Sequence, residues 1–134
     1  MELPIALLHK EIRGCRRCAT DGFPISPPPQ TGGHAPATFM VVGQAPSLSD
    51  MRGSRMYLGP AGRKLISWLI DAGFTEADMG TTVYMTALTL CFPGRLPGKS
   101  TDRAPSARER ANCRPWLNAQ RELAGATIAI TVAT

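Results

Sequence analysis

Apolar and polar positions follow two patterns along the chain, one typical of buried strands and one typical of amphipathic helices. Three short apolar runs indicate buried strands, at residues 38–42, 83–90 and 127–134. Between them, apolar side chains recur at helical spacing from Leu65 to Ala72, and Gly73 is placed to end that helix. The pair Ser106 and Glu109 has the form of a capping box, which predicts a further helix running towards Leu123.

The resulting order is strand, helix, strand, helix, strand, which is typical of a parallel sheet with helices on its faces. We therefore predict an α/β fold, a three-layer α/β/α sandwich with a short parallel sheet, in a single domain over residues 1–134. An amphipathic stretch in residues 1–18 predicts one more short helix before the sheet. Pro115 lies inside the last predicted helix, where a proline can introduce a kink.

Proline and glycine mark long irregular segments between these elements. The sequence predicts loops or turns at residues 20–37, 43–47, 52–62 and 92–105. In α/β proteins ligands bind beyond the carboxyl ends of the strands, so the turn at 43–47 is a candidate site. The third predicted strand ends the sequence, and we therefore expect part of the site to be missing.

Length and composition allow one compact globular domain. The chain has 134 residues, of which 43% are hydrophobic and 19% charged. No run approaches the ~20 apolar residues that cross a bilayer, and the N-terminal apolar run is too short for a signal peptide. We therefore expect a cytoplasmic monomer without a membrane partner.

Positive charge is concentrated in one segment. The formal net charge of the chain is +5, and residues 91–121 alone carry seven basic and two acidic side chains. Six of those seven cations are arginine, whose planar fork suits phosphate oxygens, so a nucleic-acid backbone is a candidate partner. A solvated helix face would explain the same charges.

Four cysteines suggest a metal centre. Cys15 and Cys18 form a CxxC pair, and Cys91 and Cys113 could supply two further ligands. Four thiolates hold either a structural zinc ion or an iron–sulfur cluster, and their spacing does not choose between the two. We do not expect disulfides in a cytoplasmic chain, and four free buried thiols are the remaining alternative.

An ordered set of motifs resembles the uracil-DNA glycosylase superfamily, and its iron–sulfur branches, families 4 and 5, most of all. The resemblance extends from the CxxC pair to the last strand and is carried by residues 43–47, 55–62, 84–93, Glu109 and 113–117. It implies a base-excision repair protein that rotates a damaged base out of DNA and hydrolyses its N-glycosidic bond. It also implies that Cys15, Cys18, Cys91 and Cys113 bind a [4Fe–4S] cluster, with zinc as the alternative.

The same resemblance implies roles for individual residues. The loop Gly43, Gln44, Ala45, Pro46 and Ser47 would line the base pocket and position water. Tyr57 would stack on the base, Gly59 would let the backbone approach DNA, and Ala87 would stand on the second strand, at the position with which the family reads the base. The implied partner is single- or double-stranded DNA containing uracil or another deaminated base, with Arg95, Arg103 and Arg108 as candidate phosphate contacts.

The chain departs from the family pattern at each position where a polar group acts on the base or on water. Gln44 stands where family 4 carries Glu, and Pro60 stands where family 5 carries Asp. Ala87 replaces the Asn with which family 4 reads uracil, as it does in family 5. Asp50 is the nearest acid to the motif loop, and it could assist a water molecule or be a surface aspartate.

The His-Pro-Ser motif of the family is absent from the 134 residues. The two histidines are His9, which we expect on a helix surface, and His34, which we expect in a loop. We therefore expect a truncated member with weak or no activity. The alternatives are a catalytically silent iron–sulfur module that binds DNA and a zinc-stapled structural domain.

Overall fold

The structure is a computed structural model and describes residues 4–132; the predicted contributions of residues 1–3 to the first helix and of 133–134 to the last strand lie outside this range. The helices and strands, in chain order, are α1 (Pro4–Arg13), α2 (Arg17–Thr20), β1 (Phe39–Gly43), α3 (Leu48–Gly53), α4 (Pro60–Asp71), the 3-10 helix η1 (Glu76–Asp78), β2 (Val83–Ala87), α5 (Ala107–Ala124) and β3 (Ile128–Thr131).

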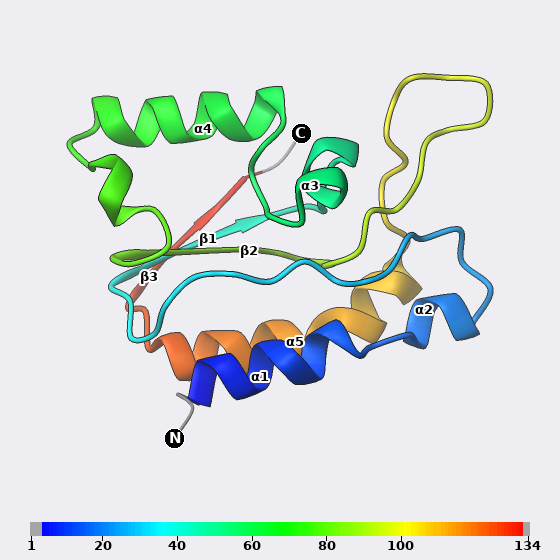
Figure 1. Cartoon of the computed structure of the whole chain (residues 1–134), viewed down its shortest axis with the longest axis horizontal. Coiled ribbons are helices and arrows are strands. Elements are labelled where there is room, and N and C mark those ends of the chain that lie inside the picture. Colours follow the sequence, from blue (N-terminus) through cyan, green and yellow to red (C-terminus); the bar gives the residue numbers. More distant parts are fainter. Residues whose placement is uncertain (1–3, 133–134) are drawn as a thin grey trace.

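The three strands form one parallel sheet in the order β2-β1-β3. Figure 1 shows α4 and η1 on one face of this sheet and α1 and α5, side by side, on the other. The predicted three-layer α/β/α fold is therefore confirmed. In β1 and β2 the last residues, Gly43 and Ala87, are paired, so both strands end at the same edge of the sheet.

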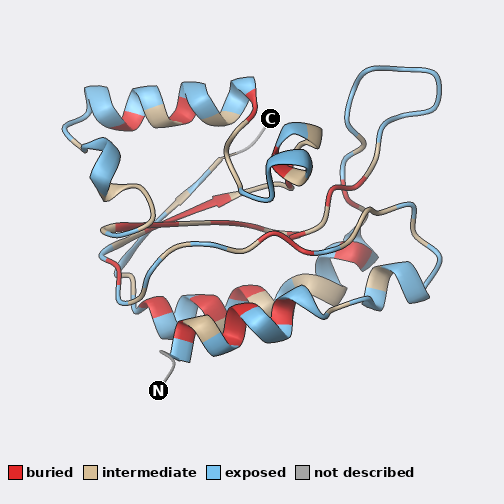
Figure 2. Ribbon diagram, viewed as in Figure 1, coloured by how far each residue is buried: buried red, intermediate tan, exposed pale blue. Residues whose placement is uncertain are grey.

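Alternating side chains of the strands fill two separate cores. Met40, Val42 and Tyr84 pack with α1 and α5, whereas Val41 and Val83 pack with Leu65 and Leu69 of α4. This is the expected result of a strand buried on both faces, because successive side chains point in opposite directions. Figure 2 shows that the buried residues gather in β1 and β2 and along parts of α1, α4 and α5.

Two expectations for the middle of the chain are corrected. Residues 52–62 do not form one long loop, because α3 extends to Gly53 and α4 already begins at Pro60, where a proline fits the first helical turn. Gly43 is the last residue of β1 rather than the first of the turn. The predicted capping box of Ser106 and Glu109 is confirmed, and α5 continues through Pro115.

A buried chain of hydrogen bonds joins α1, β2 and α5, and it overturns the expected surface position of His9. His9 is only 8% exposed. Its Nε2 lies 2.8 Å from the hydroxyl of Tyr84, which donates to Oε1 of Gln120 at 2.8 Å; the Nε2–H is therefore the donor to Tyr84. Burial, followed by the nearby Arg13 and His34, lowers the pKa of His9, which favours the neutral ring.

The loop between β2 and α5 extends beyond the carboxyl edge of the sheet (Figure 1). Its residues 95–102 are exposed, and its base is closed by an ion pair between Arg95 and Asp102 at 3.9 Å. Among residues 4–132, no helix has both the length and the apolar character that a membrane crossing requires.

We predict that Gln120→Ala destabilises the fold. Its Oε1 accepts hydrogen bonds from Tyr84 and Thr86, and its amide nitrogen donates to the carbonyl of Trp116. The substitution leaves two buried hydroxyl donors without a partner, and we expect the free energy of unfolding to fall by about 2–4 kcal/mol. Urea denaturation measures this loss. The control is Asn118→Ala, an exposed amide on the same helix, and equal stability losses in the two variants would contradict the prediction.

Candidate functional site

The paired ends of β1 and β2 bring three predicted site residues together. Gly43 lies beside Ala87 in the sheet, and the hydroxyl of Tyr57 donates a 2.7 Å hydrogen bond to the carbonyl oxygen of Thr86. A Cβ atom on Gly43 would lie 2.8 Å from that hydroxyl, closer than such atoms approach. Glycine at position 43 therefore makes room for Tyr57 against the end of the sheet.

The turn after β1 is held by Asp50, which is not the surface aspartate that the sequence suggested. Asp50 is 6% exposed, and both its oxygens accept backbone hydrogen bonds. One oxygen accepts from Ser47 N at 3.0 Å, in a capping box at the start of α3, and the other accepts from Leu58 N at 2.7 Å. Asp50 therefore connects the 43–47 turn to the segment that carries Tyr57.

Tyr57 has a left-handed backbone conformation and packs closely on the first turn of α4. Its φ angle is 64°, and a Cβ atom added at Gly62 would lie 2.5 Å from its Cα. A Cβ atom at Gly59 would lie 3.0 Å from Oγ of Ser47. These glycines therefore serve close contacts within the chain, and an approach of Gly59 to DNA stays a prediction.

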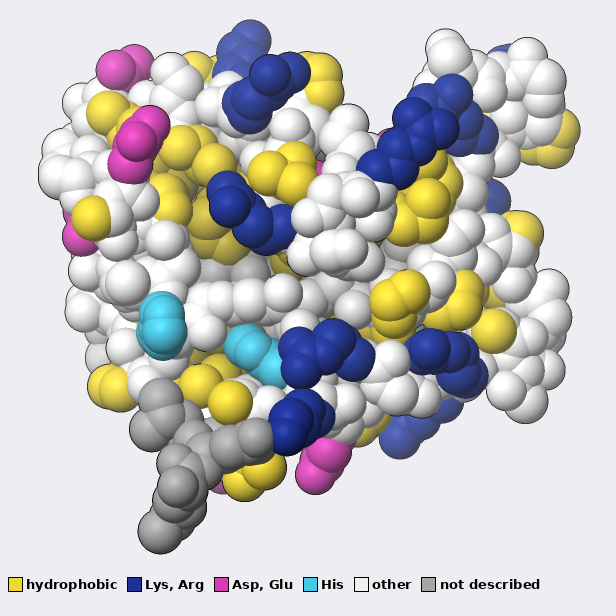
Figure 3. Space-filling model, viewed as in Figure 1, with side chains coloured by type: hydrophobic (Ala, Val, Ile, Leu, Met, Phe, Trp, Pro, Cys, Tyr) yellow, Lys and Arg dark blue, Asp and Glu magenta, His cyan; other side chains and the backbone are white. Residues whose placement is uncertain are grey.

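Tyr57 also lines an open groove beside β2. The other lining residues come from the 31–34 loop, the segments before and within α4, and the region around η1 and β2: Thr31, Gly32, Gly33, His34, Arg55, Met56, Ile66, Glu76, Met79, Gly80, Thr81 and Met85. The surface is hollowed in the face shown in Figure 3. Half-buried aromatic side chains at the edge of such a hollow can stack on a planar ligand.

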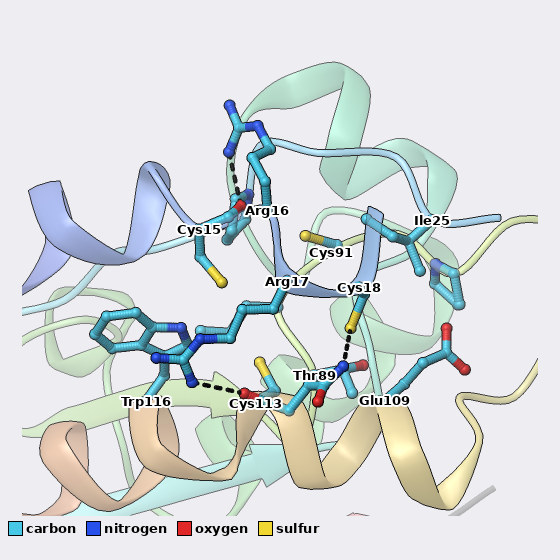
Figure 4. A pocket seen from close by; sticks show the side chains of 14 residues that line it. Cys15, Arg16, Arg17, Cys18, Ile25, Thr89, Cys91, Glu109, Cys113 and Trp116 are labelled. Carbon is cyan, nitrogen blue, oxygen red and sulfur yellow. Dashed lines mark hydrogen bonds between the residues drawn. The ribbon is translucent and has the colours of Figure 1, made fainter. Parts of the chain in front are cut away.

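All four cysteines line one cavity, which Figure 4 shows from close by. Cys15 and Cys18 come from the α1–α2 region, Cys91 follows β2, and Cys113 lies on α5. The cavity between them has a volume of about 30 Å³. All four thiols are free of disulfide bonds. The sequence prediction that these distant cysteines come together is therefore consistent with the fold.

Burial opposes ionisation of these thiols as long as nothing cationic lies between them. It raises the pKa of Cys91 to about 12, with a smaller contribution from repulsion by Cys113 and the CxxC pair. Burial likewise raises the pKa of Cys113 to about 11. Thiolates are the form that binds metal, so this donor set fits a cationic centre that would compensate their charge.

A single zinc ion and an iron–sulfur cluster differ in how closely they draw four sulfur ligands together. Within residues 4–132, no three His, Cys, Asp or Glu side chains are placed so that they could hold one metal ion. Zinc requires its ligand atoms within about 2.3 Å of the metal, which draws four sulfurs close together. A cluster of several iron and sulfide atoms is larger, so its thiolate ligands lie further from one another.

Polar and aromatic neighbours of the cavity were not identified from the sequence. Asn112 donates to Sγ of Cys18 at 3.6 Å and to Asp21 at 2.9 Å. The guanidinium of Arg17 lies over the ring of Trp116, 5.4 Å from its centre. The spacing of Cys113 and Trp116, three residues apart on one helix, is the signal that could have placed Trp116 beside the cavity.

The three predicted phosphate contacts differ in their surroundings. Arg103 is engaged within the chain: it forms a two-pronged ion pair with the buried Glu109 and donates to the carbonyl of Pro93 at 3.0 Å. Arg95 and Arg108 have side chains 47% and 71% exposed, with acidic neighbours at 3.9 and 3.8 Å. Exposed pairs of this kind are weak, so these two side chains remain accessible to a phosphate.

Surface charge is unevenly distributed on the face shown in Figure 3. Lys and Arg side chains gather over the centre and the right of the view, towards the 92–105 loop, and most acidic side chains lie at the opposite side. An anionic partner would therefore meet this face preferentially at the side of the loop.

Comparisons with known proteins agree with these features. The sequence model of a family described as "Uracil DNA glycosylase superfamily" matches residues 29–134. A type-4 uracil-DNA glycosylase of Pyrobaculum aerophilum is 28% identical over 110 residues, which are 82% of this chain and 50% of that protein. A type-4 uracil-DNA glycosylase of Sulfurisphaera tokodaii is 26% identical over 125 residues, 93% of this chain and 52% of that protein. The chain thus spans about half the length of these relatives.

We predict that the Arg103–Glu109 pair stabilises the fold at neutral pH and not in acid. Hydrogen bonds from Arg103, and then from Ser106, lower the pKa of Glu109 from 4.5 to about 2. Between these values the unfolded chain binds a proton that the folded chain does not, so the stabilisation is lost as the pH falls. Arg103→Met should therefore be less stable than the parent chain at pH 7, and the difference should narrow towards pH 2.

Urea denaturation of both proteins at several pH values measures this difference. If the difference in the free energy of unfolding between Arg103→Met and the parent chain stays constant from pH 7 to pH 2, the Arg103–Glu109 ion pair is not the source of the stabilisation.

Proposed function

This chain belongs to the uracil DNA glycosylase superfamily, and from that membership we propose that it is part of a DNA repair protein that rotates a deaminated base out of DNA and hydrolyses its N-glycosidic bond. One observation supports this proposal most strongly. Gly43, Ala87 and Tyr57 lie together at the carboxyl edge of the sheet, and the segment that follows Ala87 leads to a cavity lined by all four cysteines. In open α/β sheets this edge is where ligands bind.

Tyr57 supplies the stacking face of the proposed base pocket. Its hydroxyl is bound to Thr86, so the ring is fixed before a base arrives and loses little freedom on binding. Asp50 holds the turn of residues 43–47 against the segment before Tyr57. In this proposal the turn and the ring form two sides of one slot, and Ala87 leaves space at its base.

Bond cleavage in this proposal depends on electrostatic support for a departing base anion. Backbone amides of the 43–47 turn and a water positioned near Gln44 act on the sugar and the base. Gln44 is neutral and cannot serve as a carboxylate base. The Nε2 atom of His9 is hydrogen-bonded to Tyr84 in the core, so His9 does not supply the missing group. Loss of one positioned electrostatic group lowers the rate about 10²–10³-fold, so we expect slow cleavage by residues 1–134 alone.

We further propose that Cys15, Cys18, Cys91 and Cys113 hold a [4Fe–4S] cluster. Support comes from four free thiols that line one cavity and from the resemblance to the iron–sulfur branches of the superfamily. When bound, the cluster supplies a structural link and takes no part in bond cleavage. The thiolates would join the α1–α2 region, the segment after β2 and α5, and so position the 92–105 loop at the edge of the site.

Arg95 and Arg108 are the proposed phosphate contacts. Both are exposed and lie on or beside the 92–105 loop. Arg103 acts differently, since its ion pair with Glu109 anchors the loop to the first turn of α5. Uracil-containing DNA, single- or double-stranded, would bind across this side of the molecule.

A second candidate function is a DNA-binding module that does not cleave. It is favoured by Gln44 where family 4 carries Glu, by Pro60 where family 5 carries Asp, and by Ala87 where family 4 carries Asn. Both candidates bind uracil-containing DNA through Tyr57, and only the glycosylase releases free uracil. A uracil-release assay with single- and double-stranded DNA therefore separates them.

We predict that Cys91→Ser loses bound iron. A serine hydroxyl is a poorer ligand for iron than a thiolate. Cys91 is the cysteine that follows β2, so its loss removes the link between the sheet and the proposed cluster. After anaerobic reconstitution, iron and sulfide analysis should show loss of most of both, together with a lower free energy of unfolding. Thr89→Ser, which changes a cavity-lining residue that carries no thiol, is the control. Unchanged iron content in Cys91→Ser would remove Cys91 from the ligand set.

We predict that Tyr57→Ala loses the preference for uracil-containing DNA and keeps its iron. The variant removes the stacking face, which is worth about 1–3 kcal/mol per base, or a roughly 5- to 150-fold loss in affinity. Fluorescence anisotropy with DNA carrying uracil or thymine at one position measures this preference. Tyr57→Phe, which retains the ring, should retain most of it. Equal preference in Tyr57→Ala and the parent chain would make Tyr57 a packing residue.

A further inference from the structure

The indole nitrogen of Trp116 is a buried hydrogen-bond donor without an acceptor. Among the residues that the structure describes, its Nε1 is the one buried side-chain nitrogen or oxygen without a hydrogen-bond partner. Buried tryptophan N–H groups normally find an acceptor, because an unpaired buried donor has lost its hydrogen bond to water without gaining another. Such a group calls for an explanation, and a ligand or ion that belongs at the site is one of the few that apply.

The position of this donor points to the cysteine cavity. Trp116 lines the cavity together with all four cysteines. It lies one helical turn after Cys113 on α5, so both side chains share one face of the helix. Figure 4 shows the five-membered ring of Trp116 turned towards the cavity, on the side of Cys15. An acceptor that occupies the cavity would therefore meet the N–H group.

The orientation of the ring is held by Arg17, which also lines the cavity. The guanidinium of Arg17 lies over the ring at 5.4 Å from its centre and also donates to the carbonyl of Asn112 at 3.3 Å. The next donor on the helix, Asn112, already reaches Sγ of Cys18 at 3.6 Å. Two donors of α5 therefore lie at this cavity, one with a sulfur acceptor in place and one still without an acceptor.

Resting on the cluster of the proposed function, we propose that Nε1–H of Trp116 donates a hydrogen bond to a sulfur of that cluster and raises its reduction potential. A donor near sulfur stabilises the state that carries more negative charge, which is the reduced one. Trp116 is thus a residue that positions and tunes the cluster.

The test compares the midpoint potential of the bound cluster in the parent chain and in Trp116→Phe. Both proteins are reconstituted anaerobically, their iron and sulfide contents are measured, and the cluster is titrated by spectroelectrochemistry. Phe retains an aromatic ring under Arg17 and lacks the N–H. We expect equal iron content and an about tenfold smaller equilibrium constant for one-electron reduction, equivalent to about 59 mV towards lower potential.

The second tryptophan of the chain supplies the matched control. Trp68 lies on α4, is 58% exposed and does not line the cysteine cavity. Trp68→Phe should leave the midpoint potential unchanged. If Trp116→Phe fails to retain iron, the titration is done on a Trp68→Phe chain that carries β-(3-benzothienyl)alanine at position 116, which retains the bicyclic shape and lacks the donor.

The outcomes separate this inference from the proposal on which it rests. A full iron complement with the parent potential, in either variant at position 116, would overturn the hydrogen bond and leave the cluster standing. A parent chain that binds no iron would overturn the cluster itself, and the hydrogen bond with it. A lower potential at equal iron content supports both.

Discussion

The parallel register of β1 and β2 is the constraint on which the site depends. It places Gly43 beside Ala87, so the turn after β1 and the segment leading to Cys91 leave the sheet at one edge. Neighbouring side chains of a strand face opposite layers. If β1 slipped by one residue against β2, Val41 would point into the core that now holds Met40 and Val42, and those two side chains would point into the other core. The packing of α1 and α5 on one face and α4 on the other therefore also fixes where the candidate site lies.

Beyond that edge, side-chain contacts rather than regular structure hold the chain in place. Asp50 ties the 43–47 turn to Leu58, and the hydroxyl of Tyr57 reaches back to β2. Glu109 does the same for the long loop, by accepting from both Arg103 and the start of α5. Each carboxylate is buried and accepts backbone or guanidinium hydrogen bonds, which suits a structural role better than proton transfer.

The strands, the two long helices and the grouping of the cysteines could be predicted from periodicity, capping pairs and motif order. What could not be predicted depends on partners distant in sequence. His9 resembles a surface residue of an amphipathic helix until Tyr84 and Gln120 supply its buried partner. Arg103 resembles a phosphate contact until Glu109, six residues later, is seen to bind it. The donor of Trp116 is visible only once the cavity of Cys113 is placed beside it.

The central claim is that four thiols from three segments surround one iron–sulfur group beside a slot for a base. X-ray absorption at the iron edge of the reconstituted parent chain tests it most directly. A first shell of sulfur alone with iron neighbours in the second shell, at four iron and four sulfide per chain, is the predicted result. A chain that takes up one zinc ion on its thiols and no iron, or one whose cysteines pair as disulfides, would contradict it.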